Sequence, residues 1–134
     1  MQFQCDTTSR TPIYRQLIDQ ARTAVARGQL RPGDRLPSVR QLSRELVVNP
    51  NTVARAYTEL EREGVLVTQQ GRGAFVAEPQ QDLTKKARRK QLLEKLDELF
   101  VEAVHLGFSA DELLAMVQDR IKQFAFTATG GNGP

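Results

Sequence analysis

Apolar positions in the first half of the chain recur at the spacing of amphipathic helices. A stripe of apolar residues between positions 13 and 25 predicts a first helix, with Thr11 as N-cap, Pro12 at the first position and Gly28 at the end. A second, shorter helix is predicted from Ser38 to about Leu46, because Ser38 and a Gln three residues later have the spacing of a capping box. The intervening Pro-Gly-Asp turn suits a short strand or a tight connector.

A third helix is predicted over residues 49–64, and both of its ends are marked. Asn49 can cap the first turn, Pro50 follows where its missing N–H costs nothing, and Gly64 supplies a left-handed end. Its N-terminal half exposes amides, a hydroxyl and a guanidinium, whereas its glutamates lie toward the C-terminal end. This polarity is typical of a helix that enters the DNA major groove, although a solvated amphipathic helix would show the same stripe. With only about three residues between them, the second and third helices form a predicted helix-turn-helix.

The periodicity changes from helix to strand after the third helix. β-branched and apolar residues at 65–69 and 74–77 predict two short strands, and Gln-Gly-Arg-Gly at 70–73 predicts the hairpin loop between them. A helix-turn-helix followed by a hairpin with a basic tip is a winged helix-turn-helix. The predicted fold class is therefore mainly α with a small β-hairpin wing, and the predicted DNA-binding domain covers residues 1–78, beginning with an extended arm.

The remainder of the chain has the pattern of a dimerisation region. A polar linker is predicted at residues 79–84, two antiparallel helices at 85–126, and a disordered tail at 127–134. Leucines in the first of these helices follow a heptad seam, and two helices this short cannot enclose so many large apolar side chains alone. The sequence thus predicts a homodimer, with dimerisation residues Leu92, Leu96, Leu99, Phe100, Ala103, Leu113, Val117 and Ile121.

Charge is distributed unevenly along the chain. The net charge is +3 and the isoelectric point is about 9.4, which suits a polyanionic partner. The charge is positive before position 92 and negative after it, as expected if only the front of the chain meets nucleic acid. A basic run (Lys85, Lys86, Arg88, Arg89 and Lys90) is either the solvated start of a helix or a set of phosphate contacts.

The composition argues against a catalytic, metal or cofactor site. Cys5 is the only cysteine and His105 the only histidine, so neither a histidine-based metal cluster nor a Ser-His-Asp triad is apparent, and no cofactor is predicted. The chain shows neither a signal-peptide pattern nor an apolar run long enough to span a membrane. A cytoplasmic location is therefore expected.

Together these motifs resemble the GntR family of bacterial transcription regulators. The resemblance rests on Pro12-Ile13-Tyr14, the stretch from Leu30 to Leu42, Asn49-Pro50-Asn51-Thr52-Val53, and Gly71-Arg72-Gly73. The short two-helix tail is similar to that of the YtrA subfamily, whose members are small homodimers and often repressors. The resemblance implies a dimeric repressor of a pseudo-palindromic operator, with the third helix in the major groove and the wing near the backbone or minor groove.

The resemblance also implies which residues meet DNA. It assigns DNA contacts to a second-helix arginine, to the start of the third helix and to the wing tip: Arg40, Asn49, Asn51, Thr52, Gly71 and Arg72. Better-studied relatives with large effector domains carry arginines where this chain has Pro50 and Ala54. Arg55 is the substitute candidate for base or phosphate contact, but it could instead pair with Glu59. Arg35 is a further candidate, for which a capping or surface role is an equal alternative.

Two other functional classes fit the sequence less well. Some relatives carry an aminotransferase-like domain that binds pyridoxal phosphate, but only about 55 residues follow the wing here, and no glycine-rich phosphate loop is among them. An enzyme is therefore not predicted. The alternative is a winged-helix adaptor that binds proteins without specific DNA binding. A small-molecule effector fits the pattern, although no residue in the sequence identifies one.

Overall fold

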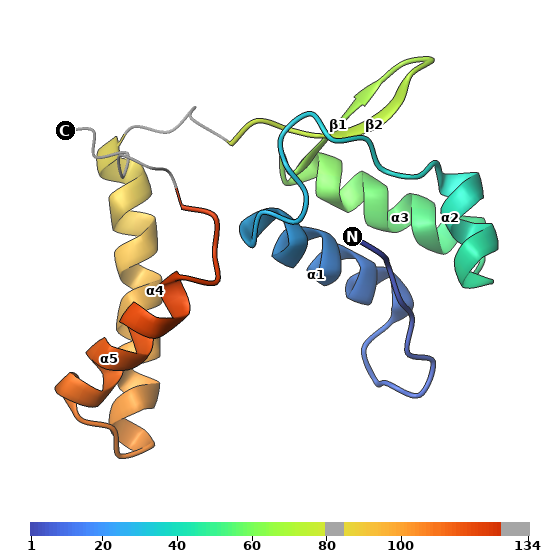
Figure 1. Ribbon diagram of the computed structural model, residues 1–134. Coiled ribbons are helices and arrows are strands. Elements are labelled where there is room, and N and C mark those ends of the chain that lie inside the picture. The colour runs from blue at the N-terminus through green and yellow to red at the C-terminus, as the bar shows by residue number, and fades with distance from the viewer. Residues whose placement is uncertain (80–84, 127–134) are drawn as a thin grey trace. The chain divides into compact units, whose positions relative to one another are not determined.

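The computed structural model describes residues 1–79 and 85–126, which divide into two compact units. The first unit contains Met1–Pro79 together with Ala125 and Phe126, and the second ends at Phe124. In chain order the elements are α1 (Ile13–Ala26), α2 (Val39–Leu46), α3 (Pro50–Arg62), β1 (Leu66–Gln69), β2 (Gly73–Val76), α4 (Lys85–His105) and α5 (Ala110–Ile121) (Figure 1). This is the mainly helical fold with a β-hairpin that the sequence predicts. Most of the predicted linker and all of the predicted disordered tail lie outside the described residues.

The core of the first unit lies between its three helices and includes residues of the arm, the connector and the wing. α1 and α2 both pack on α3, and the apolar stripe of each helix faces the others. Burial of these side chains is the main term that stabilises the unit, at about 1.5–3 kcal/mol for each large apolar side chain. The buried residues of this core are Phe3, Leu17, Ile18, Ala21, Leu36, Leu42, Val53, Ala56, Leu60, Leu66 and Val76.

The wing is a two-stranded antiparallel hairpin that gains a third, short partner segment. β1 pairs with β2 in a register that places Leu66 opposite Val76. On the other edge of β2, Leu36 donates its backbone N–H to the carbonyl of Ala74 at 2.9 Å, and Val76 donates to that of Asp34 at 2.8 Å. The connector between α1 and α2 therefore fixes the base of the wing, and the hairpin projects beyond the helices (Figure 1).

The N-terminal arm is extended over residues 1–6 and turns at residues 7–11, and two glutamines of α1 hold it in place. Gln4 donates its N–H to Oε1 of Gln20 and accepts from its Nε2, at 3.0 and 2.7 Å. Gln16 makes the same pair of bonds with Asp6, each at 2.9 Å. The two side-chain amides thus imitate a partner strand, while Phe3 is buried in the core.

Two predicted capping arrangements, at Thr11 and Ser38, and a third at Ser109 differ in how they are formed. The box at Ser109 is complete, because its hydroxyl and the Glu112 side chain each bond the backbone N–H of the other residue. Ser38 caps α2, but the Gln41 side chain turns to Glu45 at 3.2 Å, so the predicted reciprocal bond is not made. The predicted capping by Thr11 is wrong: Pro12 has an extended ψ of 148°, and α1 therefore begins one residue later, with Pro12 in the cap position.

The turn between α2 and α3 has a strained residue. Val47 has a φ of 55° and is the only residue other than glycine with a positive φ within residues 1–79 and 85–126. Its side chain is 88% exposed, so no apolar burial offsets the strain of a β-branched residue in the left-handed region. This left-handed residue ends α2 and turns the chain toward the start of α3 at Pro50.

The second unit is a pair of helices with little interior of its own. α5 folds back along the C-terminal half of α4 after a turn at Gly107 (Figure 1). Ala103 is the one buried residue of the pair among those described. No helix in residues 1–79 and 85–126 combines the length and the apolar character needed to cross a membrane.

Candidate DNA-binding site

The exposed N-terminal end of α3 presents the amide and hydroxyl groups that the sequence predicts. Asn49 caps the helix by accepting the N–H of Asn51 on Oδ1 at 2.8 Å, so its side-chain oxygen is already used. The side chain of Asn51 is exposed and that of Thr52 is half-buried. The positive end of the helix dipole makes this end favourable for phosphate.

Arg55 lies one turn beyond Asn51, on the same exposed side of α3. Its guanidinium carbon is 3.7 Å from the centre of the Tyr14 ring, which is a close cation–π stack. Tyr14 belongs to α1 and packs against the core on its inner side. The predicted alternative for Arg55 was an ion pair with Glu59, but the Glu59 carboxylate bonds Arg62.

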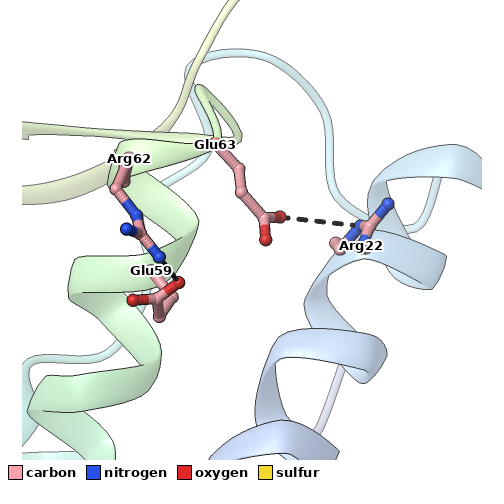
Figure 2. Close-up of polar contacts among 4 residues, drawn as sticks. All are labelled: Arg22, Glu59, Arg62 and Glu63. Atoms are coloured by element: carbon pink, nitrogen blue, oxygen red, sulfur yellow. Dashed lines mark hydrogen bonds and ion pairs between the residues drawn. The ribbon is translucent and has the colours of Figure 1, made fainter.

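The acidic end of α3 is held by arginines within the same unit (Figure 2). Glu59 pairs with Arg62 one turn later. The hydrogen bond that Arg62 donates to the Glu59 carboxylate raises the pKa of the Arg62 guanidinium. Glu63 reaches across to Arg22 on α1, with 3.7 Å between Oε1 and Nε. These pairs direct two of the three glutamates of this end toward basic partners in the protein, and the first turn of α3 contains no acidic residue.

The start of α2 is joined to α3 by a tyrosine. The hydroxyl of Tyr57 on α3 donates to the carbonyl of Pro37 at 2.6 Å, just before the cap of α2. Burial, together with the nearby Glu45 carboxylate, raises the pKa of this phenol. Arg40 follows on the first turn of α2 with an exposed side chain. The bond at Pro37 thus fixes the position from which Arg40 projects.

The tip of the wing is open. Gly71 has a φ of 78°, and nothing lies within 4 Å of where a Cβ would stand, so another molecule can approach the backbone closely. Arg72 is exposed beside it. Arg35 reaches the end of the hairpin nearest the tip, because its Nε lies 3.2 Å from the Cβ position of Gly73, which pairs with Gln69 beside the loop. Its backbone forms an isolated bridge with Phe75 of β2, so Arg35 belongs to the edge of the wing.

The predicted dimerisation residues lie on both helices of the second unit. Leu92, Leu99, Phe100 and Ile121 are exposed, Leu96, Leu113 and Val117 are half-buried, and Ala103 is buried. Between α4 and α5 is an apolar groove of about 410 Å³, lined by Leu96, Phe100, Leu113 and Val117 among others. The structure therefore brings part of the predicted set into one groove and leaves the rest facing solvent.

Two features of the site were not predicted from the sequence. One is the role of Tyr14, which appears in the family resemblance but 41 positions before the arginine that it contacts. The other is the pair Gln16 and Gln20, whose spacing of four residues indicates only a shared helix face. Among the residues described, no group of three or more His, Cys, Asp or Glu side chains could hold a metal ion.

A helix-turn-helix with a polar, acid-free leading end and an adjacent open wing defines a winged-helix DNA-binding protein. Comparison with known proteins agrees with this class. Residues 13–76 match the family described as "Bacterial regulatory proteins, gntR family". The chain is 38% identical over 129 residues to the HTH-type transcriptional repressor YtrA of Bacillus subtilis (strain 168), covering 96% of each.

Solved structures extend the similarity to three dimensions. A transcriptional antiterminator from Listeria monocytogenes EGD-e matches with a TM-score of 0.70 and 32% identity over 90% of both chains. YtrA from Sulfolobus acidocaldarius, a GntR-family transcription factor, matches with a TM-score of 0.55 and 38% identity over 71% of this chain and 97% of that one. The chain belongs to the gntR family and is a YtrA-type, DNA-binding transcription regulator. These findings support a DNA-binding function over both an enzymatic function and a protein-adaptor function.

Proposed function

We propose that this protein is a homodimeric repressor that acts in the cytoplasm by binding a pseudo-palindromic operator. The observation that carries the proposal is the leading end of α3, where exposed amide, hydroxyl and guanidinium groups gather and two of the glutamates behind them are paired with arginines. In this arrangement α3 enters the major groove, and Gly71 and Arg72 lie along the backbone or the minor groove. The relative from Bacillus subtilis is described as a repressor, which supports the same sign of regulation here.

The contacts divide into positioning and reading groups. Thr52, Arg40 and Arg72 suit phosphate, because hydroxyl and guanidinium groups bind its oxygens without regard to sequence. Asn51 can bond an adenine edge through both atoms of its amide, and Arg55 can do the same with guanine. Asn49 differs from Asn51, since its oxygen caps the helix and only its NH₂ group can reach DNA. Arg35 reaches the tip end of the wing, beside Gly73, and contributes positive charge there.

The second unit supplies the dimer. Its helices leave large apolar side chains in solvent, including Leu92 at 64% exposure, and Ala103 is their one buried residue among those described. A two-helix unit of this length cannot stabilise itself with so little interior, and a second copy presents the same apolar faces. The groove between α4 and α5 has the volume of a small ligand site. Binding of a small-molecule effector, which the sequence allows, stays a prediction.

The test of operator binding is a gel-shift series with the DNA upstream of the protein's own gene and a random duplex of equal length. We expect a specific complex in the nanomolar range that weakens steeply as salt is raised, because each neutralised phosphate releases counterions. Footprinting should then show two half-sites separated by a whole number of helical turns. Equal affinity for the random duplex would contradict specific regulation.

The dimer has its own test, which uses opposite faces of α4. Leu99 lies on the heptad seam and is 45% exposed, whereas Val101 lies on the far side of the helix and is 58% exposed. We expect Leu99→Lys to yield a monomer by light scattering and to weaken operator binding, while Val101→Lys remains a dimer. If both variants stayed dimeric, the interface would not include the seam.

A further inference from the structure

We infer that Tyr14 is a positioning residue for DNA recognition, which holds the guanidinium of Arg55 in the plane needed for a bidentate contact. The inference rests on the proposed operator binding and adds to it a residue of α1, outside the helix-turn-helix. It is carried by the 3.7 Å distance between the Arg55 guanidinium carbon and the centre of the Tyr14 ring.

The Tyr14 ring is a fixed platform. It is partly buried against the core that α1 and α3 share, so its position is set by packing. Arg55 itself is exposed on α3, where an arginine without a partner would sample many rotamers. Stacking on the ring restricts these rotamers before DNA arrives.

The stack leaves the functional part of Arg55 available. A guanidinium that lies over an aromatic ring uses one face for the contact, while its N–H groups remain in the plane and point outward. Those donors match the two acceptors of a guanine edge or two phosphate oxygens. Side-chain ordering on binding is a cost to affinity, so an arginine that is already ordered binds more tightly.

The charge around the ring suits an anionic ligand. Arg15, the next residue on α1, has its guanidinium carbon 5.6 Å from the same ring centre. Two cations thus gather at one tyrosine, beside the acid-free end of α3. Their mutual repulsion is relieved when a polyanion binds, which adds to the advantage of a DNA partner over a neutral one.

The geometry can be tested without DNA by proton NMR of the free protein. Ring current from Tyr14 should shift the side-chain protons of Arg55 upfield. We expect Tyr14→Phe to keep this shift and Tyr14→Leu to abolish it. A shift that is absent from the wild-type protein would overturn the stack itself.

The functional test is a double-mutant cycle on operator affinity, with melting temperature as the control for folding. We expect Tyr14→Phe to bind like wild type and Tyr14→Leu to weaken operator binding about three- to tenfold, since the pre-ordering of one side chain is removed. In an Arg55→Ala background, Tyr14→Leu should have no further effect. Equal losses in both backgrounds, or the same loss in Tyr14→Phe, would show that Tyr14 acts otherwise than through Arg55.

Arg55→Lys gives a second measure that does not alter the core. It keeps the positive charge and loses the planar fork, so we expect it to bind random duplex normally while discriminating less between operator and random duplex. Undiminished discrimination would overturn the inference. If the wild-type protein itself did not discriminate, the proposed function would fail, and the NMR result would still report separately on the stack.

Discussion

The hydroxyl of Tyr57 and the carbonyl of Pro37 form a hydrogen bond of 2.6 Å that links the middle of α3 to the residue before the cap of α2. This bond fixes the two helices of the helix-turn-helix relative to each other at a point where both are close to the proposed DNA-binding surface. Because the phenol is partly buried, its removal or ionisation should be measurable in the free energy of unfolding.

We expect Tyr57→Phe to lower the free energy of unfolding by about 1 kcal/mol, because the variant loses the hydrogen bond and leaves the carbonyl of Pro37 without this donor. Urea denaturation followed by circular dichroism measures this difference. Operator binding should weaken as well, since Arg40 follows the segment that Pro37 fixes. A variant with unchanged stability would mean that water replaces the hydroxyl at no cost.

The same residue predicts a dependence on pH. Burial and then the Glu45 carboxylate raise the pKa of Tyr57 in the folded protein, so the folded state holds the proton more tightly than the unfolded chain. Its contribution to stability is complete below about pH 10, the ordinary pKa of tyrosine, and is lost as the pH rises above that value. Above pH 10 the wild-type protein should lose stability more steeply than Tyr57→Phe, and parallel curves would contradict this.

Val47 offers the opposite change, a substitution that stabilises. Its φ of 55° costs a β-branched residue energy, and its side chain is exposed, so little is lost by replacing it. We expect Val47→Asn to raise the free energy of unfolding by about 1 kcal/mol, because Asn tolerates the left-handed region. Val47→Gly should gain less, since glycine loses more entropy on folding. Thermal unfolding of both variants measures the order, and a destabilised Asn variant would show that the Val47 side chain has a packing role.

The arm provides a prediction about local order. Gln16→Ala removes three side-chain bonds to the backbone of the arm and Gln20→Ala removes two, so the N–H groups of Asp6 and Gln4 respectively should exchange with solvent faster. The loss in global stability should be small, about 0.5–1 kcal/mol, because these bonds are exposed. Thr23→Ala, on an exposed part of the same helix, is the matched control. Unchanged exchange in both glutamine variants would mean that the burial of Phe3 alone holds the arm.

The sequence is sufficient to predict the elements of this fold because their signals are local. Asn49 and Pro50 mark the start of α3 and Gly64 marks its end, and each lies within a few residues of the helix terminus that it determines. The hairpin follows from two strand-forming runs around a loop with two glycines. The predicted start of α1 failed for an equally local reason. Pro12 has an extended ψ, so it takes the cap position that was predicted for Thr11, and the helix begins one residue later.

The arrangement of the site is less visible in the sequence because it depends on contacts between distant residues. Arg55 has a nearby glutamate at the spacing of a helical pair, yet the acid bonds Arg62 and the arginine stacks on Tyr14. Arg35 looks like an isolated surface charge until the connector pairs with β2 and brings it beside Gly73. Residue type predicts which side chains can contact DNA, whereas packing determines which partners they have before DNA binds.

The basic start of α4 supports a final prediction about salt dependence. Five lysines and arginines occupy residues 85–90, and the first turn contains no acidic residue, so these charges oppose the positive end of the helix dipole. Binding to phosphate would relieve this unfavourable arrangement. We therefore expect the double variant Lys86→Ala, Lys90→Ala to reduce the slope of log affinity against log salt by about two, at roughly 0.9 for each phosphate that is no longer neutralised.

The matched control is Lys95→Ala, Lys122→Ala, in which Lys95 already pairs with Glu98. An equal slope for wild type and the Lys86, Lys90 variant would identify the run as a solvated helix start, while a similar decrease in the control would indicate a general effect of net charge.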